Sequence, residues 1–179
     1  VSDTRFLGLQ ARLRTLFRRP ELRLGLAAID RERVLVLNCE ARHVHECIFA
    51  DSTHLTVSEF AGSLFERAVR EGQPILVPDL TMLPNRTVIE EQLIQSGARS
   101  FLCAPLHYQN KTIGTFALSS PNPCELDATH LPKVHEVLPL FSMAVRRSME
   151  ELNARIQTQI KERFTAIHPV VEWRFRKAV

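Results

Sequence analysis

Several features that would narrow the function are scarce or missing. No apolar run in the 179 residues approaches the length of a membrane-spanning helix, and no signal peptide is visible. The formal net charge is only +3, which by itself gives no indication of nucleic-acid binding. Four cysteines in a chain of this length do not resemble a disulfide framework, so we expect a reducing, cytoplasmic setting. We therefore expect neither nucleic acid nor direct membrane contact among the partners.

Catalytic motifs are missing as well. The sequence contains no glycine-rich phosphate loop and no nucleophile elbow. Cys103 lies in the middle of a predicted strand, where a cysteine usually acts as a small core hydrophobe. His168 precedes a proline, but its neighbours do not resemble the phosphoacceptor motif of a kinase. We predict no catalytic residue and no enzyme activity, and the sequence leaves any cofactor unknown.

The most informative stretch is a predicted β-hairpin. Two apolar runs, Ser100–Leu106 and Thr112–Ser119, flank the polar turn Gln109–Lys111. The turn predicts a loop slightly longer than the tightest kind. Neither run is polar on a whole face, and strands of this kind are covered on both faces. We therefore expect two inner strands of one sheet, with helices on one side and a second layer, such as a ligand pocket, on the other.

Periodicity and turn residues predict the remaining elements. They are a helix over 2–19, strands over Leu22–Ile29 and Val34–Cys39, a helix over Thr56–Glu71, a strand over Pro74–Val77, a helix over Thr87–Ser96 and a helix from Ala128 to about Phe164. Capping-box spacings at Thr56 and Thr87, and the glycines Gly72 and Gly97, bound the two middle helices. An internal proline predicts a break or kink near Leu138.

Motifs in and before the hairpin resemble those of a known family. Arg99–Leu106 and Ile113–Leu118 resemble the closing hairpin of a GAF domain, a small-molecule sensor module of signalling proteins. Upstream, Glu71–Pro74 and Pro78-Asp79 resemble the same family. The resemblance covers about Glu21 to Arg147. It implies a GAF/PAS-like α+β fold: a central antiparallel sheet of five or six strands, helices packed on it, and a long C-terminal helix.

The resemblance also suggests a division of the chain. We expect an N-terminal amphipathic helix over 1–20, a GAF-like sensor domain over 21–147, and a C-terminal signalling helix with the start of a linker over 148–179. The basic N-terminal helix is typical of a membrane surface or of packing on the domain, and we favour packing. We expect the chain to be a piece of a bacterial-type signalling protein with an output domain elsewhere.

In the family, ligands bind between the sheet and a variable segment, so the resemblance implies a small-molecule site, with the ligand unidentified. Its candidate residues are Phe49, Ser52, His54, Phe60, Leu64, Asp79, Arg86, Arg99, Phe101 and Ser119. An apolar cavity with few polar groups is the usual composition of such a site. Arg99 could pair with an anionic ligand. A structural bond to Asp79 or to a helix C-terminus is the alternative, and we favour it.

One cluster has metal-binding residue types: Cys39, His43, His45 and Cys47. It has no Cys-x-x-Cys pair, and next-but-one residues on a strand lie about 6.6 Å apart, too far for one zinc ion. We predict that it binds no metal.

Specialised branches of the family match poorly. The chain has no Cys-His pair for a covalent tetrapyrrole, and Asn122–Asp127 lacks the lysine and phenylalanine of the cyclic-nucleotide motif. Only Cys47 and Cys103 could approach the pocket, and their surroundings do not match those of the methionine-sulfoxide reductases.

An apolar stripe on the last helix predicts a parallel homodimer. Its spacing extends past the last strand, and an isolated helix of that length is marginal in water. The predicted interface residues are Leu13, Phe17, Phe141, Val145, Met149, Leu152, Ile156 and Ile160. In the rival arrangement, the tail over 165–179 folds back and covers the stripe in a monomer.

Three functions remain open: a regulatory sensor, which we favour, a redox enzyme of the free methionine sulfoxide reductase type, and a dimerisation module with no ligand.

Overall fold

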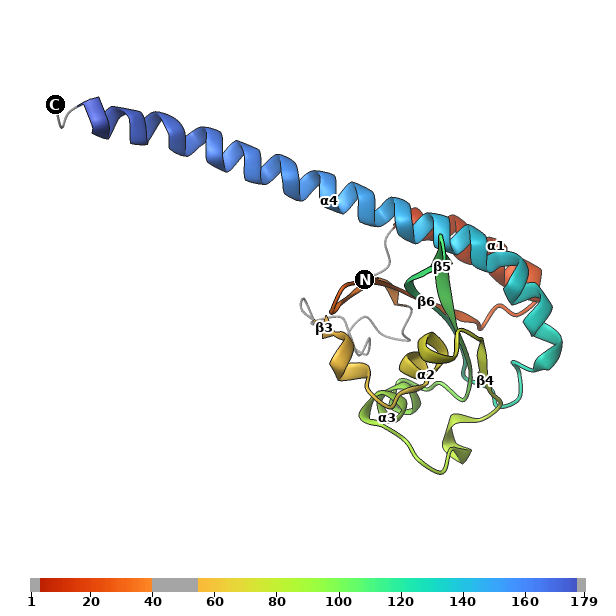
Figure 1. The fold of residues 1–179 in the computed structure, drawn as a ribbon. Coiled ribbons are helices and arrows are strands. Elements are labelled where there is room, and N and C mark those ends of the chain that lie inside the picture. The colour runs from red at the N-terminus through yellow and green to blue at the C-terminus, as the bar shows by residue number, and fades with distance from the viewer. Residues whose placement is uncertain (1–3, 40–54, 177–179) are drawn as a thin grey trace. The chain divides into compact units, whose positions relative to one another are not determined.

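The computed structural model describes residues 4–39 and 55–176 (Figure 1). The chain divides into two compact units, Val1–Val145 and Arg146–Val179. The first unit contains the sheet and its covering helices. The second consists, where it is described, of the remainder of the last helix, α4 (Leu131–Arg176).

Six strands form one sheet in the order β3-β2-β1-β6-β5-β4, and every pair is antiparallel. The strands are β1 (Arg23–Asp30), β2 (Arg33–Cys39), β3 (Leu55–Thr56), β4 (Ile75–Val77), β5 (Ser100–Tyr108) and β6 (Lys111–Ser120). The predicted hairpin β5–β6 is therefore interior, and the predicted α+β fold with a sheet of five or six strands is confirmed.

The turn of this hairpin is tighter than expected. Tyr108 pairs with Lys111, so only Gln109 and Asn110 form the loop. Both have positive φ, 48° and 60°. A two-residue loop of this handedness matches the twist of antiparallel strands, and asparagine adopts it readily.

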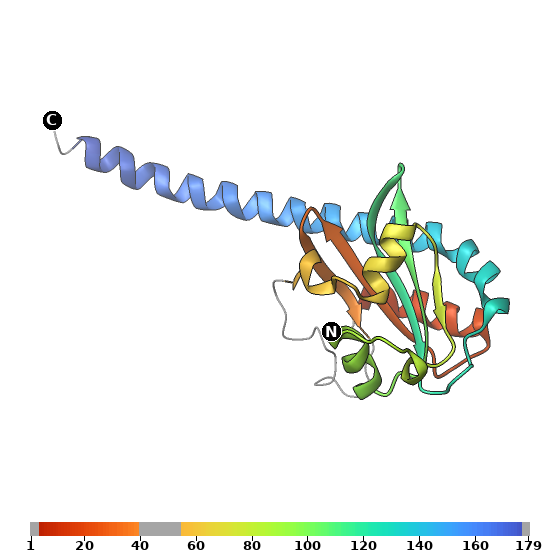
Figure 2. The same cartoon turned by 60° about the horizontal axis from the view of Figure 1, so that its bottom comes forward.

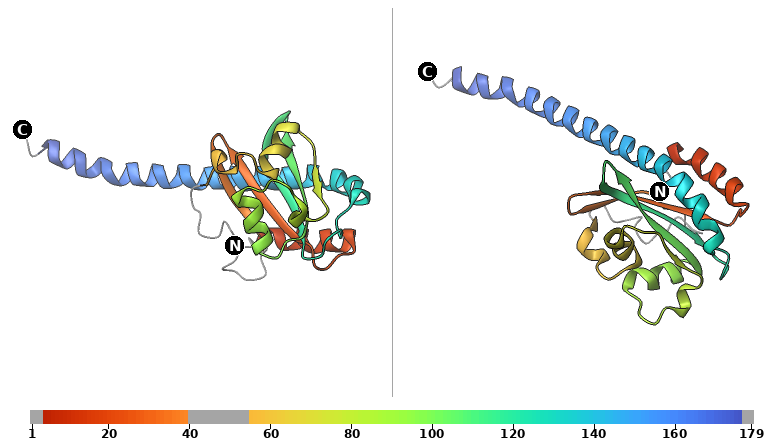
Figure 3. Two further views of the ribbon diagram at one scale, coloured as in Figure 1. Left: turned by 90° about the horizontal axis from the view of Figure 1, so that it is seen from below. Right: turned by 45° about the vertical axis from the view of Figure 1, so that its right-hand side comes forward.

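Helices cover both faces of the sheet (Figures 2 and 3). On one face lie α1 (Thr4–Phe17) and the first part of α4, where the rings of Phe116 and Phe141 pack with centroids 4.9 Å apart. On the other lie α2 (Leu64–Glu71) and α3 (Val88–Gln95). The described residues of this unit also form three short 3₁₀ helices: η2 (Val57–Phe60), η3 (Leu80–Met82) and η4 (Ala128–His130).

The helix predicted over Thr56–Glu71 is interrupted. Thr56 and Glu59 form the expected capping box, but it begins η2. The chain then turns at Gly62, whose φ is +77°, and Ser63 caps α2 by accepting a hydrogen bond from the Glu66 N–H. Because a left-handed residue cannot continue an α-helix, Gly62 divides the segment. The caps predicted at Thr87, Gly72 and Gly97 are present, with φ of 66° and 86° at the two glycines.

The predicted break near Leu138 is wrong. Helix α4 continues through Pro139 without interruption (Figure 1). Pro139 lacks the backbone N–H that would donate to the preceding turn, and because it lies on the exposed side of α4, the carbonyl left without this donor can be solvated by water. The tail, for which folding back was the alternative, continues as helix to Arg176. Among the described residues, no helix has the length and apolarity needed to cross a bilayer.

A close backbone contact between β1 and β6 generates a stability prediction. A Cβ atom at Gly114 would lie 2.2 Å from the Ala27 carbonyl oxygen. Gly114→Ala should therefore lower the free energy of unfolding by about 1–3 kcal/mol or more, as overpacking does. Gly8→Ala is the matched control, because a Cβ there meets nothing within 4 Å in α1, and it should stabilise by about 0.5–1 kcal/mol. Equal urea midpoints for the two variants would refute the contact.

Candidate functional site

A cavity of about 130 Å³ lies between the sheet and the layer formed by η2, α2 and α3. Its described lining is mostly apolar, and it comes from β1, β2, β5 and β6 on the sheet side. The lining residues are Arg23, Leu24, Gly25, Leu26, Ala27, Ile29, Val34, Val36, Asn38, Cys39, Val57, Phe60, Phe65, Glu66, Val69, Leu93, Ser96, Phe101, Thr115, Ala117 and Ser119.

The sheet side of the cavity is built from small side chains. Gly25 pairs with Ala117, and Ala27 pairs with Thr115, on the neighbouring strands β1 and β6. A Cβ at Gly25 would stand 3.4 Å from the Cβ of Ala117. Because alternate residues of a strand share a face, these positions form one surface of short side chains. The helices above cannot reach this surface, so a space remains.

Three phenylalanines form the aromatic part of the lining. The rings of Phe60 and Phe65 meet edge to face at 5.9 Å, and those of Phe65 and Phe101 at 5.5 Å. Edge-to-face contacts of this kind fix ring orientation. The three rings therefore form one continuous apolar wall of the cavity.

Few polar groups face the cavity. Arg23 is only 9% exposed, and its Nη1 donates to the Ser96 carbonyl at 2.9 Å. Glu66 accepts hydrogen bonds from the Gly62 N–H and from Arg70.

Besides Ser96, whose hydroxyl donates to the Leu93 carbonyl, two lining residues carry hydroxyls, Thr115 and Ser119. Within the described ranges, neither hydroxyl has a hydrogen-bond partner in the protein. They are therefore candidate ligand contacts.

A buried polar network lies where α1 meets the sheet. Asn38 accepts a hydrogen bond from the Gln10 side chain at 2.9 Å and donates to the Leu24 carbonyl at 2.7 Å. Both Gln10 and Asn38 are buried. The network attaches α1 to the two strands, β1 and β2, that also line the cavity.

Of the ten predicted ligand residues, Phe60, Phe101 and Ser119 line the cavity. Phe49, Ser52 and His54 lie outside the described residues. The other four take part in structural contacts away from the lining, described next. Sequence reasoning missed Arg23 and Thr115, which the alternation of β1 and β6 could have identified.

Asp79 and Arg99 form a salt bridge with each other. The Arg99 Nε and Nη2 donate to the two carboxylate oxygens of Asp79 at 3.1 and 2.9 Å. Asp79 also accepts the Thr81 N–H at the start of η3. The hydrogen bonds from Arg99 and Thr81 hold the pKa of Asp79 far below its usual range. This is the structural bond favoured for Arg99. Arg86 forms an exposed pair with Glu91 at 2.7 Å.

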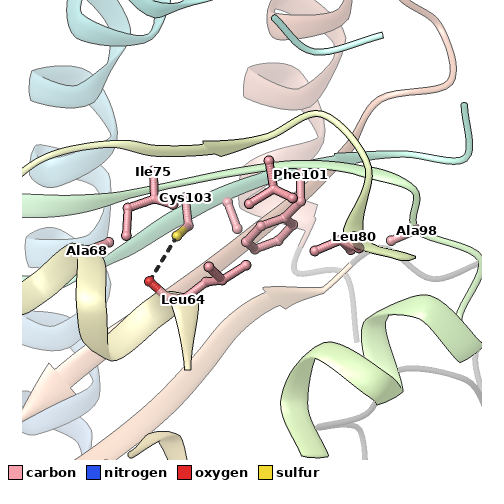
Figure 4. Packing of buried hydrophobic residues seen from close by; sticks show 9 residues of the cluster. Leu64, Ala68, Ile75, Leu80, Ala98, Phe101 and Cys103 are labelled. Atoms are coloured by element: carbon pink, nitrogen blue, oxygen red, sulfur yellow. Dashed lines mark hydrogen bonds between the residues drawn. The ribbon is translucent and has the colours of Figure 1, made fainter. Parts of the chain in front are cut away.

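Leu64 belongs to the core cluster between α2 and the sheet (Figure 4). Its carbonyl accepts a hydrogen bond from the Cys103 thiol at 3.3 Å. Cys103 is fully buried, and burial raises the pKa of its thiol far above the usual range. Neither side chain is thus available to a ligand, and the interpretation of Cys103 as a core residue fits its packing.

The predicted interface residues fall into two groups. Leu13, Phe17, Phe141 and Val145 are buried within the first unit, where Phe17 stacks on His130. Their surface is used by the chain's own core, so they cannot form an interface with a partner. In the second unit Met149 and Leu152 are half-buried, while Ile156 and Ile160 are 44% and 43% exposed. Only this second group offers apolar surface.

The described cysteines occur in two states, although the sequence did not resemble a disulfide framework. Cys103 and Cys124 are free, whereas Cys39 is disulfide-bonded. His43, His45 and Cys47 lie outside the described residues. Within the described part of the chain, no group of three or more metal-ligating side chains occurs. The absence of metal at the predicted cluster stays a prediction.

Comparison with known proteins identifies the family. The model of the GAF domain family matches residues 15–146, most of the chain, so the chain belongs to the GAF domain family, which is typical of sensor signalling proteins. No curated protein matches the chain.

Solved structures show the same fold at low identity. A GAF domain of a sensor histidine kinase from Bacillus halodurans is 14% identical, with a TM-score of 0.56, and the match covers 72% of this chain and 84% of that one. A domain of a sensor kinase from Sinorhizobium meliloti is 13% identical, with a TM-score of 0.59 and coverage of 86% and 99%. The free methionine-R-sulfoxide reductase of Neisseria meningitidis is 17% identical, with a TM-score of 0.55 and coverage of 80% and 77%.

The Asp79–Arg99 pair predicts a pH dependence of stability. Because the folded-state pKa of Asp79 is depressed, the stabilisation is complete above the ordinary value of 3.8 and is lost as pH falls below it toward the folded pKa. In urea titrations Asp79→Asn should be less stable than the parent by a constant amount between pH 5 and 7, and the gap should shrink below about pH 4.

Asp30→Asn is the control for removing one negative charge, because Asp30 is exposed at the end of β1. A gap for Asp79→Asn that stays constant down to pH 2.5 would contradict the depressed pKa.

Proposed function

We propose that the chain is a regulatory sensor domain that binds a small molecule in the cavity over β1 and β6. The observation that carries the proposal is a preformed, mostly apolar cavity with a few polar groups inside a GAF fold. Ligand sites usually have this composition. A pure dimerisation module would need no such space. We place the domain in a bacterial-type signalling protein, as in the two sensor kinases that share its fold.

The domain is proposed to be non-catalytic. The Cys103 thiol is buried and donates to a carbonyl, so it is a poor nucleophile. Cys124 is exposed in the loop after β6, and it does not line the cavity. The rival function is a reductase, because Cys39 lines the cavity and is disulfide-bonded. We favour the sensor because neither free cysteine combines an accessible thiol with a place in the cavity.

The second unit is proposed to form a parallel helical dimer that carries the signal. The apolar residues at Met149, Leu152, Ile156 and Ile160 recur every three or four positions, so they share one side of α4. Burying each such side chain contributes about 1.5–3 kcal/mol before entropy is subtracted. Charged pairs, Arg146–Glu150 and Arg147–Glu151, lie elsewhere on the same helix. The helix therefore has one apolar side suited to a second copy.

The cavity proposal is tested by filling the space. Ala27→Leu adds three carbon atoms to the sheet side of the cavity. Native mass spectrometry of freshly purified protein should show a bound small molecule in the parent and its loss in this variant. Ala11→Leu is the matched control on the exposed side of α1, and it should retain the molecule. An identical bound mass in the folded Ala27→Leu variant would place the ligand elsewhere.

The dimer proposal is tested by paired charges on opposite sides of α4. Leu152→Glu with Ile156→Glu places two carboxylates in the apolar stripe and should convert the dimer to a monomer in sedimentation velocity. Ala154→Glu with Thr158→Glu has the same spacing and charge, about half a turn around the helix, and should leave the dimer intact. If both double variants sediment like the parent, α4 is not the interface.

A further inference from the structure

We propose that the ligand of this cavity is a small uncharged aromatic molecule of about one ring, a phenol or a close relative, whose polar group contacts the Thr115 hydroxyl. The inference rests on the proposed sensor function and narrows it to a chemical class. Three features of the described lining support it: the polar side chains that are already paired, the hydroxyl that is not, and the aromatic wall beside that hydroxyl.

Both charged residues of the described lining are engaged within the protein. Arg23 donates from Nη1 to the Ser96 carbonyl at 2.9 Å and takes part in a further interaction. Glu66 accepts hydrogen bonds from the Gly62 N–H at 3.2 Å and from Arg70 at 3.1 Å. A charged ligand would leave water for a mostly apolar space in which these two side chains already have partners, and that transfer is unfavourable. An uncharged ligand avoids it.

The uncharged polar side chains of the lining divide into two groups. The Asn38 amide both accepts and donates hydrogen bonds in the buried network at α1, and the Ser96 hydroxyl donates to a backbone carbonyl of α3 at 2.8 Å. Thr115 and Ser119 have no such partner among the described residues. Thr115 is only 7% exposed, whereas Ser119 is half-buried. Thr115 therefore carries the more deeply buried hydroxyl without a partner.

The Thr115 hydroxyl borders the open space of the cavity. In the described part of the chain, every fully enclosed side-chain nitrogen or oxygen has a hydrogen-bond partner. The Thr115 Oγ1 has none, so it must border open space, and the space that Thr115 lines is the cavity. A buried hydroxyl without a partner lowers stability. The polar group of a ligand removes that penalty by accepting the hydrogen bond of this hydroxyl or by donating to it.

An aromatic wall lies beside this hydroxyl. Thr115 pairs with Ala27 across β1 and β6, and Ala27 packs against the core cluster that contains Phe60. Phe65 packs against the same cluster, and its ring meets that of Phe60 edge to face at 5.9 Å. A planar ring packs against such a wall in an offset or edge-on manner. A ligand with its ring on this wall and a hydroxyl toward Thr115 uses both features.

The size of the cavity limits the ligand to about one ring. A dry apolar cavity of about 150 Å³ accommodates benzene, and this one measures about 130 Å³. Thr115 and Ser119 are four residues apart on β6, a span of about 13 Å along a strand. A molecule of one ring that lies against Phe60 and Phe65 therefore contacts the Thr115 hydroxyl rather than both hydroxyls.

A water molecule is the alternative partner for the Thr115 hydroxyl. A buried water needs polar partners, and a single hydroxyl in an apolar lining is a poor site for one. If a water nevertheless occupied it and the ligand made no polar contact there, replacing Thr115 by valine would change the affinities for polar and apolar probes alike. The test therefore measures a ratio of affinities rather than one affinity.

The experiment compares three probes by isothermal titration calorimetry at about pH 7: phenol, toluene, in which a methyl group replaces the hydroxyl, and ionised benzoate. The parent should bind phenol about tenfold or more tightly than benzoate, because the carboxylate loses its hydration on entering an apolar cavity. Thr115→Val keeps the branched side chain without its hydroxyl. It should weaken phenol relative to toluene by about fivefold or more.

Two further variants control for the loss of a threonine. Thr115→Ser retains the hydroxyl and should keep the phenol-to-toluene ratio of the parent. Thr112→Val is the same change on the same strand outside the cavity lining, where the hydroxyl contacts His107, and it should also leave the ratio unchanged. Melting curves establish that each variant is folded.

Three results would overturn the inference while the small-molecule function stands. One is tighter binding of benzoate than of phenol by the parent, which indicates a charged ligand. The second is an unchanged phenol-to-toluene ratio in folded Thr115→Val. The third is binding of no probe by a parent that retains a molecule of another class in native mass spectrometry. If no probe binds and no molecule is retained, both the inference and the proposed function fail.

Discussion

The two inner strands β5 and β6 have no polar face, and the rest of the first unit follows from that constraint. Leu102, Leu106 and Leu118 are fully buried, as are Phe101 and Cys103 on the opposite face. Such a hairpin leaves apolar surface exposed to water unless both sides are covered. The structure meets this requirement with two helical layers, and Phe141 of α4 packs directly on Phe116 of β6. The cavity exists only because one of the two layers leaves part of the sheet untouched.

Much of this arrangement could be predicted from local sequence. The alternation of apolar residues predicted the inner hairpin, and the capping boxes at Thr56 and Thr87 predicted helix starts that the structure confirms. The failures were local too. The helical pattern of the sequence does not reveal that Gly62 adopts a left-handed φ, which ends the helical segment. Pro139 predicts a break because it lacks an N–H and crowds the preceding turn, yet it lies on the exposed side of α4 and the helix continues through it.

The site was less predictable than the fold, for physical reasons. Large and charged residues attract attention in a sequence, yet the sheet side of the cavity also includes the small residues Gly25, Ala27 and Ala117. Their importance lies in the volume that they do not fill, which no single position reveals. Arg23 contacts the Ser96 carbonyl 73 residues away, so its place depends on the tertiary fold. Asp79 and Arg99 were candidate ligand residues, and they form with each other one of the structural bonds that were favoured for Arg99.

The cavity is itself an argument for binding over pure assembly. The cavity leaves about 130 Å³ without protein atoms, so the side chains that line it lack contact partners on that side. A larger side chain at Ala27 would fill part of this space. A domain whose task was dimerisation through α4 alone would gain stability from such substitutions at no functional loss. A ligand that fills the space recovers the lost contacts when it binds, which couples occupancy of the cavity to the stability of the sheet. A sensor requires such a coupling, and it follows from small side chains at a few alternating positions on two strands.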